Sequence, residues 1–190
     1  MAATILGVPF CAVKDGRCTD GSEKRDPAMK LPQTGGCQCG ALRYEVSEAP
    51  QLVYTCHCTE CQRLTGSAFS MALVVSAAAL HFAGLEPSPL QRPADSGRTV
   101  TRWVCPDCGT WIWSGPKPDP IMLDALRVRA GTLDDTSWLR PTVHFWTRSA
   151  QPWVLLPEGD RRFETQPEDL AWMRAGSARD GRDLLDHQDA

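Results

Sequence analysis

The stretches GCQCG at residues 36–40 and CPDCG at residues 105–109 decide the fold of this chain. In each, two cysteines lie close enough to bind one metal ion, and neighbouring glycines accept the unusual backbone angles of the turn. A structural Zn²⁺ takes four ligands at about 2.3 Å, so one pair of thiolates fills half of its shell. We therefore expect Cys37, Cys39, Cys105 and Cys108 to form one closed, structural Cys₄ zinc site across a gap of 65 residues.

A third cluster, CHCTEC at residues 56–61, carries three thiols within six residues. Three protein ligands with one open coordination position are the pattern of a catalytic zinc site, so Cys56, Cys58 and Cys61 are candidates for an open Cys₃ site. Three thiolates give the Zn²⁺ centre a net negative charge, which weakens the metal as a Lewis acid. A thiol substrate ionises more readily than water and suits such a centre better.

Two residues inside this cluster are ambiguous. Glu60 is a candidate general acid or base near the open position, although a lone carboxylate is more often a solvated side chain. Alternation along an extended segment points His57 away from the metal. A second interpretation makes the cluster another closed structural site, in which His57, His81 or His144 supplies the fourth ligand.

Composition and charge argue against several classes of function. The 190 residues include 20 basic and 23 acidic ones, a net charge of -3, so we do not expect binding to nucleic acid or to a membrane surface. The longest apolar run, Met71–Leu80, is well short of the roughly 20 residues that cross a bilayer. No basic residue precedes the apolar stretch Ile5–Val13, so no secretory signal is expected. Clustered cysteines then indicate metal binding in the cytoplasm, where thiols stay reduced, with Cys11 and Cys18 left as free thiols.

Short runs rich in Val, Tyr, Trp and Thr predict an all-β fold of antiparallel sheets with irregular loops and little helix. Strands are expected at Ala41–Val46, Gln51–Thr55, Phe69–Val75, Leu80–Phe82, Thr99–Val104, Trp111–Trp113, Val128–Gly131 and Val143–Trp146. The first two lie on either side of a turn, and the two around CPDCG form a hairpin of the zinc-ribbon type. A proline-rich loop is expected at Leu85–Gly97, a helical turn at Leu123–Arg129 and a helix at Pro167–Arg174.

These patterns divide the chain into three parts. Residues 1–33 show no sustained period of 2 or 3.6 and are expected as a weakly ordered extension. Residues 34–157 hold the three cysteine clusters and are expected to form one zinc-binding domain. Residues 158–190 carry 9 acidic residues against 5 arginines and are expected as a polar tail.

Several motifs together resemble the glutathione-dependent formaldehyde-activating enzyme family, also called the centromere protein V family. They are GCQCG at 36–40, CHCxxCQRxxG at 56–66, CPxCGT at 105–110, HxW at 144–146 and PW at 152–153. The resemblance covers roughly residues 33–156 and implies an Mss4-like all-β fold with zinc-ribbon-like knuckles. It also implies two Zn²⁺ ions, with the Cys₄ set structural and Cys56, Cys58 and Cys61 catalytic.

The resemblance further implies a carbon–sulfur lyase with a small-molecule thiol and an aldehyde as partners. In the named reaction of the family, glutathione and formaldehyde form S-hydroxymethylglutathione. Zinc would ionise the glutathione thiol, and Glu60 or a water would protonate the forming alkoxide. The alternative is a non-catalytic zinc scaffold or protein-binding module, because a fold does not settle function. Nothing in the sequence indicates the oligomeric state.

Overall fold

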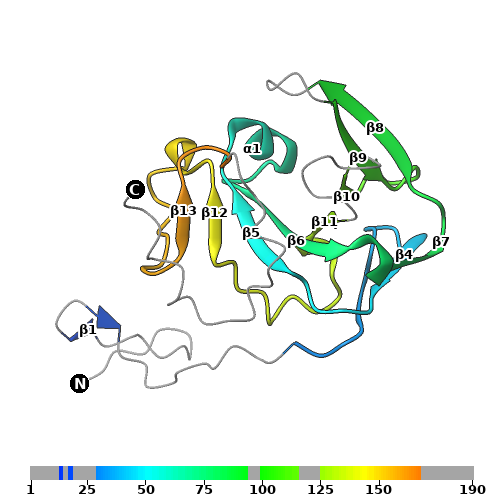
Figure 1. The fold of residues 1–190 in the computed structure, drawn as a ribbon, viewed down its shortest axis with the longest axis horizontal. Coiled ribbons are helices and arrows are strands. Elements are labelled where there is room, and N and C mark those ends of the chain that lie inside the picture. The colour runs from blue at the N-terminus through cyan, green and yellow to red at the C-terminus, as the bar shows by residue number, and fades with distance from the viewer. Residues whose placement is uncertain (1–12, 15–16, 19–28, 94–98, 116–124, 168–190) are drawn as a thin grey trace, which may run out of the picture.

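A three-stranded and an eight-stranded sheet form the body of the chain in the computed structural model (Figure 1). It describes residues 13–14, 17–18, 29–93, 99–115 and 125–167. The three-stranded sheet has the order β3 (Gln33–Gly36), β4 (Leu42–Val46), β7 (Leu80–Gly84). The eight-stranded sheet has the order β13 (Arg161–Phe163), β12 (Val143–Phe145), β5 (Leu52–Cys56), β6 (Ser70–Ser76), β11 (Ala125–Arg129), β10 (Trp111–Ser114), β9 (Thr99–Val104), β8 (Ser88–Pro93).

The remaining elements are short. Strands β1 (Val13–Lys14) and β2 (Arg17–Cys18) pair as a small antiparallel hairpin. The one α-helix of the described residues is α1 (Thr59–Thr65), and three 3₁₀ turns lie at Ala77–Ala79, Ala130–Thr132 and Thr147–Ser149. None of the described helices is long and apolar enough to cross a membrane. The described residues contain thirteen strands and one short α-helix, which confirms the predicted all-β class.

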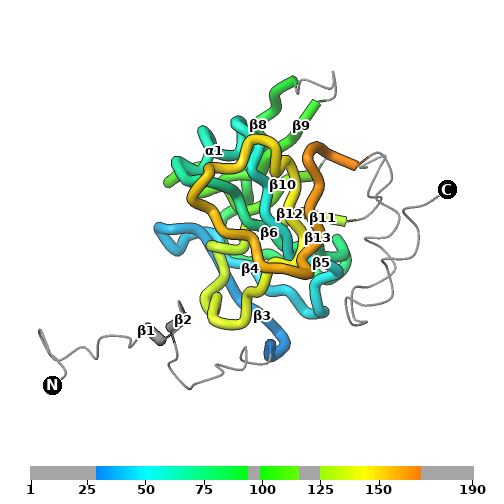
Figure 2. The backbone as a smooth tube through the Cα atoms, turned by 90° about the vertical axis from the view of Figure 1, so that its left-hand side faces the viewer, coloured from blue at the N-terminus to red at the C-terminus, as the bar shows by residue number. Residues whose placement is uncertain are grey.

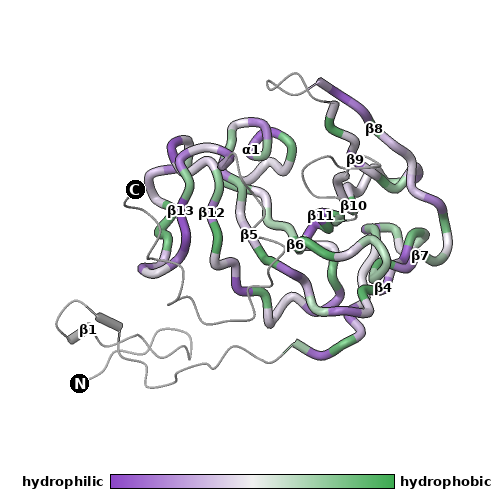
Figure 3. Tube along the Cα trace, viewed as in Figure 1, coloured by the Kyte–Doolittle hydropathy of each residue, from purple (hydrophilic) through white to green (hydrophobic). Residues whose placement is uncertain are grey.

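Strand β6 is central because it is buried on both faces. Its residues Leu73 and Val75 pack in a core with β4 of the other sheet, while Ala72 and Val74 belong to a second core on the opposite face. Burying a Val or Leu side chain contributes about 1.5–3 kcal/mol, so a continuous apolar strand suits this position. In Figure 3, β6 is mostly hydrophobic and the edge strand β8 is mostly hydrophilic.

The two expected strands at Ala41–Val46 and Gln51–Thr55 exist but do not form a hairpin. Strand β4 pairs with β3 and β7, whereas β5 pairs with β6 and β12. Two pairings in the larger sheet are parallel, β12 with β5 and β12 with β13, so the sheet is mixed rather than wholly antiparallel. The hairpin expected around CPDCG is confirmed as β9 and β10.

Two local predictions are wrong and a third is right for only half of its length. The helical turn expected at Leu123–Arg129 is replaced by β11, because its residues pair along their length with β6. The loop expected at Leu85–Gly97 contains β8, an edge strand that tolerates two prolines since an edge leaves backbone N–H groups unpaired. The strand expected at Val128–Gly131 ends at Arg129, and a 3₁₀ turn follows. Tertiary pairing has overridden local preference in each case.

The sheet also continues beyond residue 157. Strand β13 pairs in parallel with β12, in the register Val143 with Arg161 and Phe145 with Phe163. The structure thus adds three residues to the sheet from a segment expected as a polar tail. The helix expected at Pro167–Arg174 lies outside the described residues, apart from Pro167, which is in no regular element.

Candidate metal centres

The four cysteines of the predicted closed site come together from two turns. Cys37 and Cys39 lie in the turn between β3 and β4, and Cys105 and Cys108 lie in the turn between β9 and β10. Their four sulfurs all lie within 4.8 Å of one another. The Cys37 and Cys39 sulfurs are 3.3 Å apart, and those of Cys39 and Cys105 are 3.8 Å apart. A tetrahedral Zn²⁺ with bonds of about 2.3 Å requires separations of about 3.8 Å, so the residues fit this metal.

The same hydrogen bond and the same glycine conformation bend both turns. The N–H of Gly40 donates to the Cys37 carbonyl at 3.1 Å, and the N–H of Gly109 donates to the Cys105 carbonyl at 2.9 Å. Both glycines adopt positive φ, 81° and 73°, a conformation that costs other L-residues free energy. These bends aim each pair of sulfurs at the other pair.

Thr110 ties the two turns together, a role that its place in the CPxCGT motif did not reveal. Its hydroxyl accepts from the Gln38 N–H at 3.1 Å and lies 3.1 Å from the Cys108 sulfur. Hydrogen bonds from the hydroxyl and the backbone N–H of Thr110 lower the pKa of the Cys108 thiol to about 5. The thiolate required of a metal ligand is therefore favoured at Cys108.

The three cysteines of the second cluster lie where β5 passes into α1. Cys56 ends β5, Cys58 is the N-cap of α1, and Cys61 follows in its first turn. The Cys58 sulfur accepts a hydrogen bond from the Cys61 N–H at 3.4 Å and lies 3.6 Å from the Cys56 sulfur. All three sulfurs are half-buried and lie within 4.8 Å of one another. Their spacing fits one metal ion, as in the first cluster.

Electrostatics in this cluster favour a bound cation. The pKa of the Cys58 thiol is lowered to about 2 by hydrogen bonds from the Cys56 and Cys61 thiols. The pKa of Cys56 is raised because its thiol hydrogen-bonds to Cys58 and Cys61 and is buried. Without a cation, one sulfur is therefore ionised at the expense of its neighbours. Three thiolates this close together require a positive charge between them.

No fourth ligand completes this group within the part of the chain that the structure describes. The group of potential metal ligands contains the three cysteines and no histidine or carboxylate. The ring of His57 is buried and hydrogen-bonds to Thr55 instead, at 2.9 Å. His144 also bonds Thr55, at 2.7 Å, and His81 lies 3.3 Å from the Ser47 hydroxyl. The interpretation of this cluster as a closed site completed by a histidine therefore gains no support.

Glu60 is held by two arginines. Its carboxylate oxygens pair with Arg63 at 3.1 Å and with Arg92 of β8 at 2.6 Å. Helix α1 lies toward β8 in both views of the chain (Figure 1, Figure 2), as the ion pair between Glu60 and Arg92 requires. The carboxylate does not join the group of sulfurs. A role for Glu60 in catalysis therefore stays a prediction.

Arg129 is a functional candidate that the sequence analysis missed. Register pairs Tyr54 with Ala72 and Ala72 with Arg129, so Arg129 lies on the face of the sheet that also carries Cys56. Its guanidinium is buried and lies 4.1 Å from the ring centre of Trp111. Burial lowers its pKa, and its proximity to the Tyr54 hydroxyl and to the Cys61 and Cys56 thiols opposes this effect. In the sequence, the signal was an arginine at the end of an apolar segment. We expected that segment, Leu123–Arg129, to form a helical turn, so the arginine was not assigned to the face of a sheet.

The family model of the glutathione-dependent formaldehyde-activating enzymes matches residues 32–149. The chain belongs to this family. The matched region holds both cysteine clusters and Arg129, and it ends before β13. No curated protein matches the chain. Among solved structures, it is similar to a protein of Rhodobacter sphaeroides at 20% identity and a TM-score of 0.42, over 57% of this chain and 91% of that one.

Proposed function

We propose that this chain is a zinc-dependent carbon–sulfur lyase that adds a thiol, glutathione or a similar one, to formaldehyde or another small aldehyde. The observation that carries the proposal is the half-buried group of three sulfurs, which has no fourth ligand among the described residues. Its position within the region that the family model matches supports the same function. The two substrates are small molecules, and no nucleic acid or membrane surface takes part.

The two clusters have different roles in this proposal. Cys37, Cys39, Cys105 and Cys108 hold a structural Zn²⁺ that joins the turn of the smaller sheet to the β9–β10 hairpin of the larger one. Residues 34–157 form the zinc-binding domain, between the extension 1–33 and the segment 158–190. The seven cysteines of both clusters form no disulfide, so we place the protein in the cytoplasm, where thiols stay reduced.

Cys56, Cys58 and Cys61 hold the catalytic Zn²⁺. When bound there, it would favour the ionised form of a thiol. The N-terminus of α1 supports these ligands, because the Cys61 N–H donates to the Cys58 sulfur. Arg129 supplies a buried positive charge on the same face of the sheet, which balances the negative charge of the thiolates.

The reaction consumes no oxidant or reductant. The substrate sulfur forms a bond to the aldehyde carbon, the carbonyl π-bond breaks, and its electron pair moves to the oxygen. The proton that the thiol loses ends on that oxygen. Glu60 is our candidate to carry this proton, which requires its ion pairs with Arg63 and Arg92 to open, and a water molecule is the alternative carrier.

Exchange spectroscopy by NMR with ¹³C-formaldehyde and glutathione tests the proposal, because formaldehyde and thiols also combine without an enzyme. We expect the zinc-loaded chain to speed exchange between free and glutathione-bound formaldehyde. The Cys61→Ser variant should lose this effect, and Cys11→Ser, which changes a cysteine that we predicted as a free thiol, should keep it. Exchange no faster with the protein than without it would instead favour the non-catalytic zinc scaffold.

A further inference from the structure

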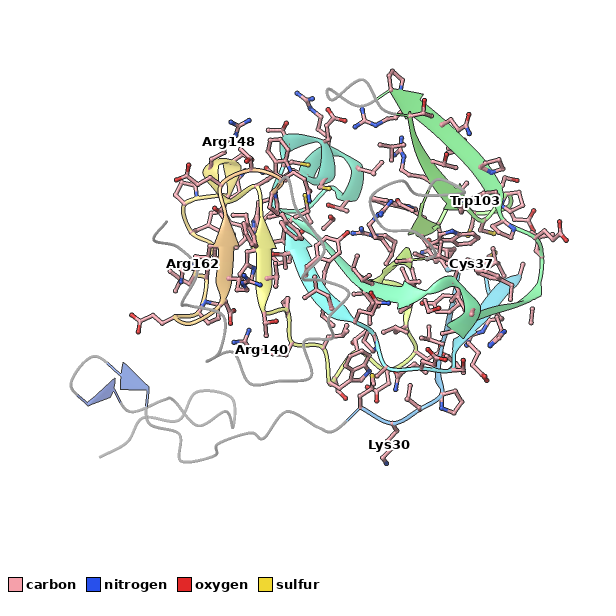
Figure 4. All side chains as sticks on the ribbon, viewed as in Figure 1. Lys30, Cys37, Trp103, Arg140, Arg148 and Arg162 are labelled. Carbon is pink, nitrogen blue, oxygen red and sulfur yellow. The ribbon has the colours of Figure 1, made fainter. Side chains whose placement is uncertain are left out.

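The four cysteines of the closed cluster are not equally exposed. In each turn the first cysteine is buried, with 6% of Cys37 and 0% of Cys105 exposed. The second cysteine of each turn, Cys39 or Cys108, is exposed. Figure 4 shows Cys37 close to Trp103, which packs against the same core. The cluster therefore has one side that faces the core, and the other side, which faces solvent, is formed by Cys39 and Cys108, the exposed pair.

The exposed pair has little cover from the rest of the chain. A glycine follows each of its cysteines, and a Cβ atom added to Gly40 or Gly109 would meet no atom within 4 Å apart from its chain neighbours. By contrast, all three cysteines of the other cluster are half-buried. A reagent in solution therefore reaches the exposed pair more readily than any other cysteine of the two clusters.

Exposed thiolates are the form of cysteine that oxidants attack. A metal-binding cysteine is a thiolate, and the thiolate is the nucleophilic form of the side chain. Susceptibility to oxidation follows thiolate character together with exposure. Both conditions hold at the exposed pair, whereas the buried Cys37 and Cys105 satisfy only the first.

We propose that the exposed pair is an oxidation site, at which hydrogen peroxide converts the thiolates of Cys39 and Cys108 into a disulfide. One thiolate attacks a peroxide oxygen, the O–O bond breaks, and a sulfenic acid and a hydroxide form. The second thiolate attacks the sulfenic sulfur, the S–S bond forms, and a second hydroxide leaves. Two protons from solvent convert the hydroxides into water, and the peroxide gains the two electrons that the sulfurs lose.

The geometry of the cluster suits this bond. All four sulfurs lie within 4.8 Å of one another, and a disulfide requires about 2.05 Å. The Gln38 N–H donates to the Thr110 hydroxyl at 3.1 Å, which already holds the two turns together beside the exposed pair. The disulfide therefore joins the β3–β4 turn to the β9–β10 turn when each sulfur moves by little more than about 1 Å.

Oxidation exchanges a metal link for a covalent one. A structural Zn²⁺ takes four ligands, so Cys37 and Cys105 alone fill half of its shell and the ion leaves. The disulfide still joins the smaller sheet to the β9–β10 hairpin, and it limits the freedom of the unfolded chain. The domain therefore stays folded while it releases one zinc, and a dithiol reductant reverses the reaction. This oxidation goes beyond the proposed thiol addition and shares with it only the structural Zn²⁺.

Peroxide treatment of the zinc-loaded full chain tests the proposal. With hydrogen peroxide, a metallochromic indicator should detect the loss of about one zinc per chain. Peptide mapping by mass spectrometry should find the Cys39–Cys108 disulfide first, and dithiothreitol with added zinc should restore the starting state. A first disulfide within one turn or within the three-cysteine cluster would overturn the proposal, and so would zinc loss without a disulfide.

Calorimetry tests the covalent link between the two turns. The oxidised chain should melt at a higher temperature than the reduced chain from which EDTA has removed the zinc, because only the oxidised chain keeps a bond between the turns. Equal melting temperatures would show that the disulfide does not join the two turns, and the proposal would fail.

The Cys61→Ser variant locates the oxidation. It removes a ligand of the other cluster and keeps all four cysteines of this one. With peroxide it should release its remaining zinc and form the same disulfide at the wild-type rate. Retention of that zinc would place the oxidation in the three-cysteine cluster and refute the proposal. Because this variant lacks the catalytic cluster, failure of the proposed thiol addition leaves its result unchanged.

Discussion

Replacing Cys105 by serine tests the division of the cysteines into a structural and a chemical site. Cys105 is fully buried, and its sulfur lies 3.8 Å from that of Cys39. The substitution removes one of four sulfur ligands and leaves a hydroxyl at a fully buried position. Because the cluster joins the two sheets, we expect the whole domain to lose stability.

The expected loss follows from the energy of a structural zinc. Such an ion contributes about 10–16 kcal/mol in small zinc domains, so one ligand in four carries roughly 3–4 kcal/mol. An unsatisfied buried hydroxyl adds about 1 kcal/mol. A change of 1 kcal/mol shifts the melting temperature of a domain of this size by about 2–4 °C, so Cys105→Ser should melt roughly 8–20 °C lower.

Cys61→Ser is the matched control, because Cys61 is half-buried in the other cluster. Elemental analysis should find two zincs per wild-type chain and about one in this variant, and calorimetry should find its melting temperature within a few degrees of the wild type. If Cys61→Ser melts as low as Cys105→Ser, the three-cysteine cluster is structural and our division is wrong. One zinc in the wild type would show that this cluster binds none.

Three further predictions concern single side chains. Gly109→Ala should cost about 1–2 kcal/mol of unfolding free energy because of its positive φ, whereas Gly131→Ala, which meets open space, should cost almost nothing; urea denaturation compares the two. The pKa of Asp160 is lower in the folded state, so its stabilisation exists above the unfolded pKa of about 3.9 and is lost as the pH falls through the folded value. Asp160→Asn should therefore flatten the acid limb of stability against pH, and an unchanged limb would contradict its ion pairing. Because Arg129 balances the negative charge of the thiolates in our proposal, Arg129→Gln should weaken binding of the glutathione thiolate about tenfold. The charge-transfer band of the Co²⁺-substituted protein measures this affinity, and wild-type affinity would remove Arg129 from the site.

Local features of the sequence predicted much of the metal chemistry. Cysteines two or three residues apart chelate through the turn that they share, so their grouping depends little on the rest of the fold. The structure brings both predicted sets of sulfurs together. Most strands were also predicted, because period-2 patterning and β-branched residues are local signals. The seven-residue helix α1 was missed, since the extended pattern of β5 continues up to its N-cap.

Only the tertiary structure decided which strands pair and which side chains face the clusters. The sequence predicted a helical turn at Leu123–Arg129 and a strand only from Val128, and the pairing of β11 with β6 is what carries Arg129 to the face of Cys56. The hydrogen bonds of His144 likewise reach Thr55 across 89 residues of sequence and Asp160 across 16, so that no motif contains them. The sequence by itself determined which residues can bind metal, because chelation is local. The buried charges around them arise from register, which is a property of the whole sheet.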